Sequence, residues 1–555
     1  MTAPANTGPP PGGGEERHLR RDIGRTGLLF AGVGSIIGSG WLFGAMNASI
    51  IAGPAAIFSW AIAGVMIIFI GLSFSELGTM FPVTGGVIRF PQYAFGGFAS
   101  YSMGWITWVA AAVVPAIETT GMLQYATKWF HFTDKHQVGG EPVHTLTPVG
   151  ILTALVLLAI FCVINAVGVK FFTQINNVLV WWKLAVIVLV VVLFLVTAFH
   201  GGNFTSHGFA PSGSKAMFTA IATSGITFSY LGFRQAIELA GESDDPRRNV
   251  PFAVIGSVVL CMVIYVLLQI AFIGALSGGD LSHGWSGLSF TDDFGPLAAI
   301  STAIGLGWLA TVLYIDAVIS PGDTGLIYSA VTARLGYTMA RNGNAPAGIG
   351  KLSTRGVPWV SLLITFVVGA VMLLPFPSWQ QLVGLVTSAT VMSFASGPLA
   401  HAALRRELPD HDRPFRLWGG DIIPILAFFS ANMIIYWTGW NTNWKFFVII
   451  VFGYVLMGIF AATGQLKYRM DWKAGASWVI PWLAGIALIS YLGDYDGGRA
   501  VFKGLLMGFA VNAVWSVVIF FVAVKMRLPG SRVREIIDEL PHDEVDSEAE
   551  PALAG

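Results

Sequence analysis

Long apolar stretches separated by short polar loops make up most of the chain. Fourteen of them approach or exceed the roughly 20 residues that a helix needs to cross a bilayer. Helices and closed barrels are the only backbones that a bilayer tolerates, and stretches of this length favour helices. The sequence therefore predicts an all-α integral membrane protein with about 14 transmembrane helices, near residues 27–48, 54–80, 90–127, 147–167, 177–199, 214–240, 250–277, 297–332, 358–376, 380–404, 421–440, 445–464, 477–493 and 500–526.

The composition supports a membrane protein. Of the 555 residues, 54% are hydrophobic and 11% are charged, whereas soluble chains carry about 25% charged residues. So few charges cannot cover a water-soluble surface, which excludes a soluble enzyme. The net charge of zero excludes a basic nucleic-acid-binding protein.

The cysteines and histidines of the chain do not form the clusters that bind metal ions. Neither the two cysteines nor the ten histidines have the spacing of metal ligands, so we expect no metal and no cofactor. His401, near the end of span 10, is expected at the membrane interface rather than in a proton relay.

The lysines and arginines are distributed unevenly between alternate loops. With the N-terminus placed in the cytoplasm, 23 of the 31 fall on the cytoplasmic side, 6 on the opposite side and 2 within spans. Positive loops face the cytoplasm, so we expect a plasma-membrane protein with a cytoplasmic N-terminal segment (1–26) and an acidic cytoplasmic tail (527–555). The tryptophans expected in the interfacial aromatic belt are Trp129, Trp359, Trp379 and Trp440.

Span 1 contains a glycine-rich interruption near its middle, Gly38-Ser39-Gly40. Glycine weakens a helix and lets the backbone unwind without a side-chain clash. Unwound backbone is tolerated in a bilayer only where it is buried or lines a polar cavity. The free amides that start the second half-helix would bind an anion such as a carboxylate. The alternative is that these glycines only permit close helix packing.

Span 6 is interrupted in a similar way, by small and polar residues between Gly225 and Gly232. Spans 1 and 6 are five apart, so they occupy corresponding positions in two halves of five spans. An odd number of spans per half makes the halves inverted relative to each other in the membrane. Two interrupted spans in this arrangement are typical of the binding site of a secondary transporter.

Four ordered motifs lie within about residues 20–410. They are Gly38-Ser39-Gly40, Glu76-Leu77-x4-Pro82-x2-Gly85-Gly86, Gly232-Phe233-x4-Glu238-x-Ala240-Gly241-Glu242-x3-Pro246-x2-Asn249-x-Pro251, and Ala333-Arg334-x4-Met339-Ala340-Arg341-Asn342-Gly343-x-Ala345-Pro346. These motifs resemble those of the amino acid–polyamine–organocation permeases. The resemblance implies a LeuT-like core of two inverted repeats, 27–199 (spans 1–5) and 214–404 (spans 6–10), with four extra helices at 421–526. Within the superfamily, the chain looks most like bacterial aspartate/glutamate–proton symporters.

The resemblance also implies where an amino acid substrate would bind. Its α-carboxylate would lie on the amides around Ser39 and Gly40, and its amino group against carbonyls of the two interruptions. Phe228 falls where the family has an aromatic gate, although helix packing explains this residue equally well. The expected substrate-binding residues are Ile36, Ile37, Gly38, Ser39, Gly40, Phe228, Ser229, Tyr230, Leu231 and Arg234.

Lys183 lies inside span 5. Its side chain could extend to the membrane interface, but an ionisable group within a membrane is a functional candidate by default. Its position is similar to that of the family's span-5 lysine, whose ammonium stands in for a sodium ion. We favour a role in proton coupling, because a buried lysine can load and release a proton.

Arg234 departs from the family pattern, since many relatives have glutamate at this place. Arginine stays charged, so it needs an anionic partner, either a substrate side chain or a protein carboxylate, with equal weight given to each. Contact with the substrate would favour an acidic amino acid, whereas an unpaired Glu118 or Asp316 in the pocket would favour a cationic or neutral one. Asp316 and Asp323 share a helix face unless Pro321 bends the helix. The candidate carboxylates are Glu118, Asp316, Asp323 and Glu238, the first three also being proton-coupling candidates.

These features favour a secondary active transporter that imports an amino acid, preferably an acidic one, with a proton by alternating access. The expected partners are the amino acid, the proton and the lipid bilayer, with no nucleic acid, and the sequence does not indicate an oligomeric state. An amino acid exchanger without net proton coupling and a non-transporting membrane sensor remain as alternatives. A channel is less consistent with interrupted helices and intramembrane charges.

Overall fold

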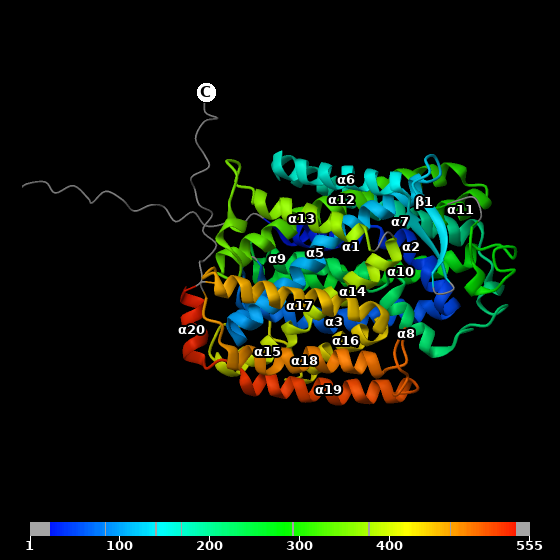
Figure 1. Cartoon of the computed structure of the whole chain (residues 1–555). Helices are drawn as coiled ribbons and strands as arrows, with labels where there is room; N and C mark the ends of the chain where they lie inside the picture. Colours follow the sequence, from blue (N-terminus) through cyan, green and yellow to red (C-terminus); the bar gives the residue numbers. More distant parts are fainter. Residues whose placement is uncertain are drawn as a thin grey trace, which may run out of the picture.

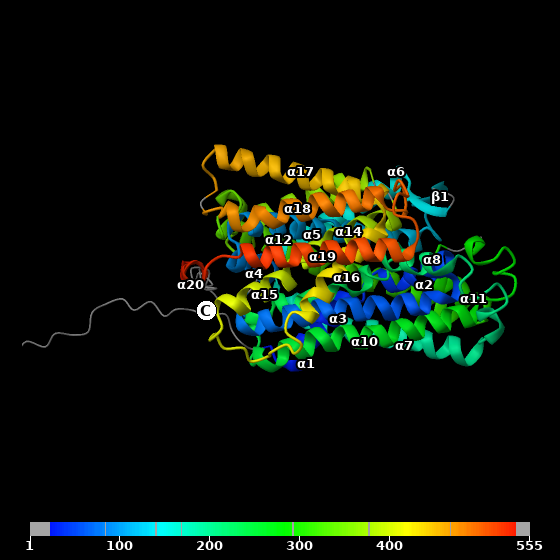
Figure 2. The same cartoon turned by 90° about the horizontal axis from the view of Figure 1, so that it is seen from below.

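The computed structural model describes residues 23–539 except 84, 139–140, 168, 291–293, 376–377 and 467. Residues 1–22 of the predicted N-terminal segment and 540–555 of the predicted acidic tail therefore lie outside the described residues. The helices run side by side along one axis (Figure 1). The helices α15 (Ser396–Glu407) and α20 (Gly530–Glu539) lie at one end of the molecule, and strand β1 (Thr133–Val138) lies at the other, as Figure 2 also shows.

The first half of the chain contains the interrupted span 1 and a small departure from the all-helical prediction. An antiparallel hairpin of two strands follows span 3, with Thr133 paired to Leu146. The elements are α1 (Arg25–Ile36), α2 (Gly40–Ala52), α3 (Ala56–Met80), α4 (Gly86–Phe95), α5 (Gly97–Ala126), β1, β2 (Glu141–Leu146), α6 (Pro148–Val167) and α7 (Val169–Thr197).

The second half begins with span 6, which is divided into three pieces. These are α8 (Gly213–Thr223), the short 3₁₀ helix η3 (Phe228–Phe233) and α9 (Arg234–Glu238). The elements that follow are α10 (Pro246–Ala275), α11 (Pro296–Ala303), α12 (Gly307–Arg341), α13 (Trp359–Leu373), α14 (Trp379–Phe394), α15, α16 (Ile422–Thr438), α17 (Trp440–Ala462), α18 (Trp472–Leu492), α19 (Leu505–Met526) and α20.

Each of the fourteen predicted spans overlaps at least one of these helices. Within the described part of the chain, nine helical stretches are long and apolar enough to cross a membrane, and the bent pair in span 6 makes a tenth. The helices α13 and α16 are apolar but shorter. The all-helical membrane architecture is therefore confirmed, while the number of fourteen crossings and the inverted repeats stay predictions.

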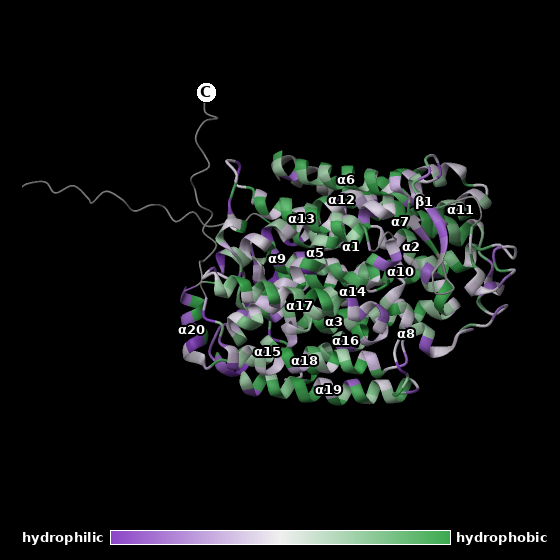
Figure 3. Cartoon of the chain, in the orientation of Figure 1, coloured by the Kyte–Doolittle hydropathy of each residue, from purple (hydrophilic) through white to green (hydrophobic). Residues whose placement is uncertain are grey.

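The burial of the helices separates a protein core from a lipid-facing rim. The most apolar stretches of α5 and of α14–α15 are completely buried, whereas only 22% of those in α6 and α17 and 28% of that in α19 is buried. Apolar residues extend along the helices, and hydrophilic ones gather towards the two ends (Figure 3). The exposed apolar rim is what a helix in contact with lipid requires.

Candidate functional site

The predicted interruption of span 1 is present. The helix α1 ends at Ile36 and α2 begins at Gly40. A Cβ atom on Gly38 would come within 2.7 Å of Glu118 Oε1, and one on Gly40 would collide with the Ser229 hydroxyl. The two glycines therefore bring the unwound backbone into close contact with spans 3 and 6, so unwinding and close packing occur together.

The predicted interruption of span 6 is also present. The helix α8 ends at Thr223, η3 begins at Phe228, and the two parts of the span meet at 45°. Gly225 has a φ of +98°, in a region that side chains rarely adopt. Gly232 lies against the backbone of Ser35 at the end of α1. The two interruptions thus pack directly against each other.

A carboxylate of the chain itself occupies the start of the second half-helix. The Ser39 amide donates a hydrogen bond to Glu118 Oε2 at 2.8 Å. Glu118 is fully buried, and its Oε1 atom has no hydrogen-bond partner among the described residues. Backbone amides at a helix start stabilise negative charge. The interruption therefore binds a carboxylate at the place where the sequence predicts an anion site.

Three aromatic rings lie over this interruption. Trp379 Nε1 donates to Ser39 Oγ at 2.8 Å, and its ring centroid is 5.0 Å from that of Phe43 and 6.3 Å from that of Phe228. Trp379 is buried, so its predicted place in the interfacial belt is wrong. The reason is that α14 begins beside the interruption and not at the lipid surface, where Trp129 lies exposed.

The remaining predicted residues of span 6 have partners that point in different directions. The Tyr230 hydroxyl donates to the Trp60 carbonyl at 3.1 Å, away from the interruption. Ser229 Oγ donates to the Gly225 carbonyl at 2.8 Å. Leu231 is buried. Ser229 also packs against Gly40 of span 1, whereas the hydroxyl of Tyr230 turns to span 2.

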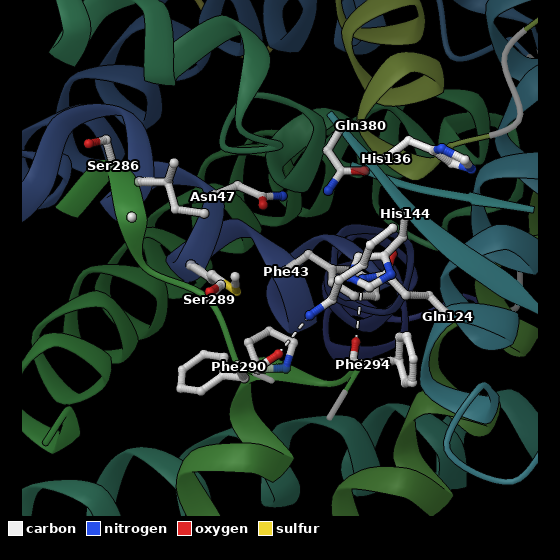
Figure 4. A pocket seen from close by; sticks show the side chains of 15 residues that line it. Phe43, Asn47, Gln124, His136, His144, Ser286, Ser289, Phe290, Phe294 and Gln380 are labelled. Atoms are coloured by element: carbon white, nitrogen blue, oxygen red, sulfur yellow. Dashed lines mark hydrogen bonds between the residues drawn. The ribbon is translucent and has the colours of Figure 1, made fainter. Parts of the chain in front are cut away.

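A cavity of about 310 Å³ adjoins the aromatic rings on the side of the β-hairpin. In Figure 4, Asn47, Gln124 and Gln380 surround it together with residues of the hairpin. Burial and the nearby Lys135 lower the pKa of His144 to about 4, so this ring is neutral at physiological pH. The cavity volume falls in the range of small-molecule sites. The described lining residues are Phe43, Met46, Asn47, Ile50, Gln124, Lys135, His136, His144, Ser286, Gly287, Ser289, Phe290, Phe294, Pro296 and Gln380.

Lys183 is fully buried and does not extend to the interface. Its ammonium forms an ion pair with Asp323 at 2.6 Å and donates to the Gly34 carbonyl at 3.0 Å and to Thr324 Oγ1 at 3.3 Å. Gly34 belongs to α1, whereas Asp323 and Thr324 belong to α12. The lysine of span 5 therefore joins span 1 to span 8.

Asp316 is bound to the neighbour of this lysine. Its Oδ1 atom accepts hydrogen bonds from Trp182 Nε1 at 2.9 Å and from Ser320 at 2.8 Å. Asp316 and Asp323 thus both contact α7, although Pro321 stands between them. Of the two, only Asp323 forms an ion pair with Lys183 among the described contacts.

Arg234 is buried at the first position of α9. The structure describes no ion pair for it, and its Nε and Nη1 atoms lack hydrogen-bond partners among the described residues. The guanidinium lies 5.7 Å from the centre of the Tyr328 ring. None of the four candidate carboxylates is therefore its ion-pair partner within the described residues. Glu238, the nearest of them in sequence, accepts backbone hydrogen bonds from Gly85 and Val87.

A separate charged cluster lies beyond these residues, at the end of α3. Glu76 is fully buried and accepts hydrogen bonds from Arg405 at 2.8 and 2.5 Å and from the Leu417 amide at 2.7 Å. His401 Nε2 lies 3.0 Å from the same carboxylate. His401 is buried, so its predicted place at the membrane interface is wrong, because α15 packs against α3 inside the protein.

Sequence reasoning missed the side chains that complete these contacts. Thr324 and Trp182 are neighbours of predicted residues, and their polar groups inside apolar spans were the only signal for them. Tyr328 lies one turn beyond Thr324 on α12 and had no such signal, since buried tyrosines are common in any core.

The chain resembles known membrane transporters over most of its length. The amino acid permease family matches residues 23–524. The chain is 40% identical over 487 residues to the glutamate/serine transporter AimA of Bacillus subtilis, which covers 87% of this chain and 90% of the relative. It is 33% identical over 523 residues to the aspartate-proton symporter of the same organism, and this alignment covers 94% of this chain and 99% of the relative. A branched-chain amino acid permease, BcaP, is 25% identical over 456 residues.

The family match covers nearly all of the described helices. The alignments with the two transporters extend over most of the length of each relative. This chain therefore belongs to the amino acid permease family, a family of multi-pass membrane transporters rather than enzymes.

Proposed function

We propose that this permease imports an acidic amino acid together with a proton, by alternating access. The observation that carries the proposal is the guanidinium of Arg234, which is buried next to the interruption of span 6 with no ion pair among the described residues. Glu238 attracts this guanidinium without forming an ion pair with it. A buried charge without a direct partner is costly, so an anionic substrate group is the simplest direct partner for Arg234.

The substrate's α-carboxylate would take the Ser39 amide from Glu118. Both groups are carboxylates, and the amide that now donates to Glu118 at 2.8 Å would donate to the substrate in the same way. The adjacent Gly40 amide would supply a second donor. Displacement requires the Glu118 side chain to turn away or to take up a proton, which makes Glu118 a second candidate for proton coupling beside Lys183.

The substrate's amino group would meet the carbonyls exposed at the ends of the first half-helices. Ile36 and Ile37 carry such carbonyls, and those of Phe228 and Leu231 lie on the facing segment. Helix C-termini favour positive charge. The Ile36 carbonyl accepts two hydrogen bonds from described residues. One comes from the Gly38 amide at 3.1 Å, and the other, a long one of 3.4 Å, comes from the Tyr265 hydroxyl.

The side-chain carboxylate would pair with Arg234. The guanidinium can bind a carboxylate through two parallel hydrogen bonds. The relatives named above include a glutamate/serine transporter and an aspartate-proton symporter, which is consistent with an acidic substrate for this chain.

The proton would act on the Lys183–Asp323 pair. Loss of the proton from Lys183, or its transfer to Asp323, would remove the attraction that joins Gly34 of α1 to α12. Spans 1, 2, 6 and 7 could then rock against spans 3, 4, 8 and 9. In this scheme the lysine ammonium replaces a sodium ion, so transport needs no sodium.

Uptake of labelled aspartate into proteoliposomes tests the substrate assignment. We expect sodium-free uptake driven by an inward proton gradient without internal substrate. In Arg234→Ala, the KM for aspartate should rise about 10- to 100-fold, because a charge-assisted pair is lost. Arg248→Ala, which removes an exposed arginine near the same span, should leave KM unchanged.

Other outcomes would contradict the proposal. Full retention of aspartate affinity in Arg234→Ala would eliminate the acidic-substrate role. Uptake that strictly requires internal substrate would indicate an exchanger, and aspartate binding without any flux would indicate a sensor.

A further inference from the structure

A second cavity lies at the other end of the molecule from the β-hairpin, where α18 begins and α19 ends. Its volume is about 790 Å³, and residues 469–474 and 525–529 line it. None of these residues belongs to the interruptions or to the charged groups around them. The cavity is therefore separate from the proposed transport pathway.

The lining of this cavity is strongly basic. Its one acidic residue, Asp471, is already paired with Arg469 at 3.2 Å and with Arg532 at 3.6 Å. Arg527 is paired with Glu407 at 2.6 Å. The described lining cations are Arg469, Lys473, Lys525 and Arg527.

Two of these cations supply a positive charge that the protein does not balance. Lys473 and Lys525 are exposed, and the described part of the chain offers neither of them an ion pair or a hydrogen bond. Lys473 stands at the start of α18 and Lys525 at the end of α19. Because α18 and α19 pack against each other, the two ammonium groups lie at the same end of one helix pair.

The same helix pair carries exposed apolar side chains. Both α18 and α19 are long and apolar enough to cross a membrane. Ile480 on α18 and Phe521 on α19 are exposed to 51% and 52%. Trp472, which lines the cavity, is exposed to 55% and stands where an interfacial tryptophan belongs. The cavity is thus lined by two lysines without ion pairs among the described residues, and the two helices that carry them present exposed apolar side chains farther along.

We propose that this cavity binds the headgroup of an anionic phospholipid. Lys473 and Lys525 contact the phosphate, Trp472 lies at the level of the glycerol, and the acyl chains follow the apolar faces of α18 and α19. Basic pockets between transmembrane helices at the cytoplasmic surface are suited to such headgroups. A free phosphate would satisfy the lysines but would make no use of the apolar surface, and a zwitterionic lipid would bring no net negative charge.

Thermal unfolding of the purified full-length protein in a neutral detergent tests this proposal. The probes are phosphatidylglycerol, phosphatidylcholine with the same chains, and inorganic phosphate. We expect phosphatidylglycerol alone to raise the unfolding midpoint, as any ligand of the folded state does. In the double variant Lys473→Gln/Lys525→Gln, the concentration needed should be about tenfold higher, because both phosphate contacts are lost. The control Lys351→Gln/Lys503→Gln, which changes two exposed lysines outside the cavity, should respond as the unmodified protein does.

Three results would overturn the lipid site. These are an equal response to phosphatidylglycerol in the double variant, an equal response to phosphatidylcholine, or an equal response to inorganic phosphate, the last indicating a soluble anion. The assay requires no transport, so its outcome is independent of the substrate and proton assignments made above.

Discussion

Gly40 is the residue at which α2 begins, and Ser229 of span 6 fills the space that a Cβ atom would need. The absence of a side chain here allows the two interruptions to approach each other. The same holds for Gly38, which faces Glu118 and Thr324. At the residue scale, the site therefore depends on glycines for space and on a few buried polar groups for charge.

Gly40→Ala should abolish most uptake while the protein still folds. The new methyl group must push Ser229 aside, and overpacking of this kind typically costs about 1–3 kcal/mol. Proteoliposome uptake and the unfolding midpoint measure the two effects. Gly458→Ala is the control, because Gly458 is exposed on α17 and, apart from the adjacent backbone of its own helix, no atom of the described residues lies within 4 Å of the place that its new methyl group would take.

The double variant Gly40→Ala/Ser229→Ala sharpens this test. Removal of the Ser229 hydroxyl relieves the closest contact, so part of the uptake should return. If Gly40→Ala alone transports normally, then close contact between the interruptions is not needed for transport.

Lys183→Ala should remove the dependence of uptake on the proton gradient. The change deletes the ammonium that binds Asp323, Gly34 and Thr324. Initial uptake rates between pH 5.5 and 7.5, with and without a gradient, measure the effect. Because Asp323 is left as an unpaired buried charge, Lys183→Ala/Asp323→Asn provides a second variant that folds without this penalty. Unchanged pH dependence in both variants would refute the proton role of Lys183.

At the scale of elements, the Glu76 cluster joins α3 to α15 and to the loop that follows it. Glu76 receives hydrogen bonds from Arg405 and from the Leu417 amide, and Arg413 Nε lies 3.4 Å from it. The single carboxylate of Glu76 thus balances Arg405 of α15 and Arg413 of the loop that follows α15.

Glu76→Gln should lower the stability of the fold by about 3 kcal/mol, because Glu76 is fully buried and the change leaves the partly buried Arg405 and Arg413 without their anion. Thermal unfolding in detergent is the measurement. The surface pair Arg247–Asp412, in which both side chains are about two-thirds exposed, provides the control: Asp412→Asn should cost less than about 1 kcal/mol. Equal effects of the two changes would mean that the cluster does not join these elements.

The sequence is informative about where the spans break and less so about what the side chains contact. Glycines and small polar residues inside apolar stretches predict both interruptions. A lysine about a third of the way into span 5 indicates a functional candidate; the structure buries it, and its role stays a prediction. The pattern does not distinguish Asp316 from Asp323 as the partner of Lys183, because residues seven apart share a helix face. It places Trp379 at the interface, since a tryptophan at a helix start looks the same whether the helix begins in lipid or inside the protein. It does not predict the hairpin at 133–146, because the strands are short and their pairing depends on tertiary contacts.

At the scale of the whole molecule, the two ends differ in charge. The end with α15 and α20 carries the basic loops, and the end with the hairpin carries few cations. We expect the basic end to face the cytoplasm, because positive loops are retained there.

Cysteine labelling in intact cells tests this orientation. Ser282→Cys lies in an exposed loop at the hairpin end, and Arg355→Cys in an exposed loop at the basic end. A membrane-impermeant thiol reagent should label the first in intact cells and the second only after lysis. The unmodified protein, which contains Cys162 and Cys261 within helices, gives the background. Labelling of Arg355→Cys in intact cells would reverse the assigned orientation.

The hydrogen bond between the Ser39 amide and Glu118 bears on how much of the driving gradient is lost when the carrier moves without substrate. A carrier that cycles without cargo dissipates the gradient that drives it, and one that admits small anions leaks. Glu118 already accepts the hydrogen bond of the Ser39 amide. A small anion such as chloride or formate must therefore compete with a carboxylate that belongs to the chain and has a high effective concentration. Under the proposed function, an acidic amino acid would displace Glu118 because its ammonium and its second carboxylate add contacts that a small anion lacks. This would limit cycling of the carrier without substrate.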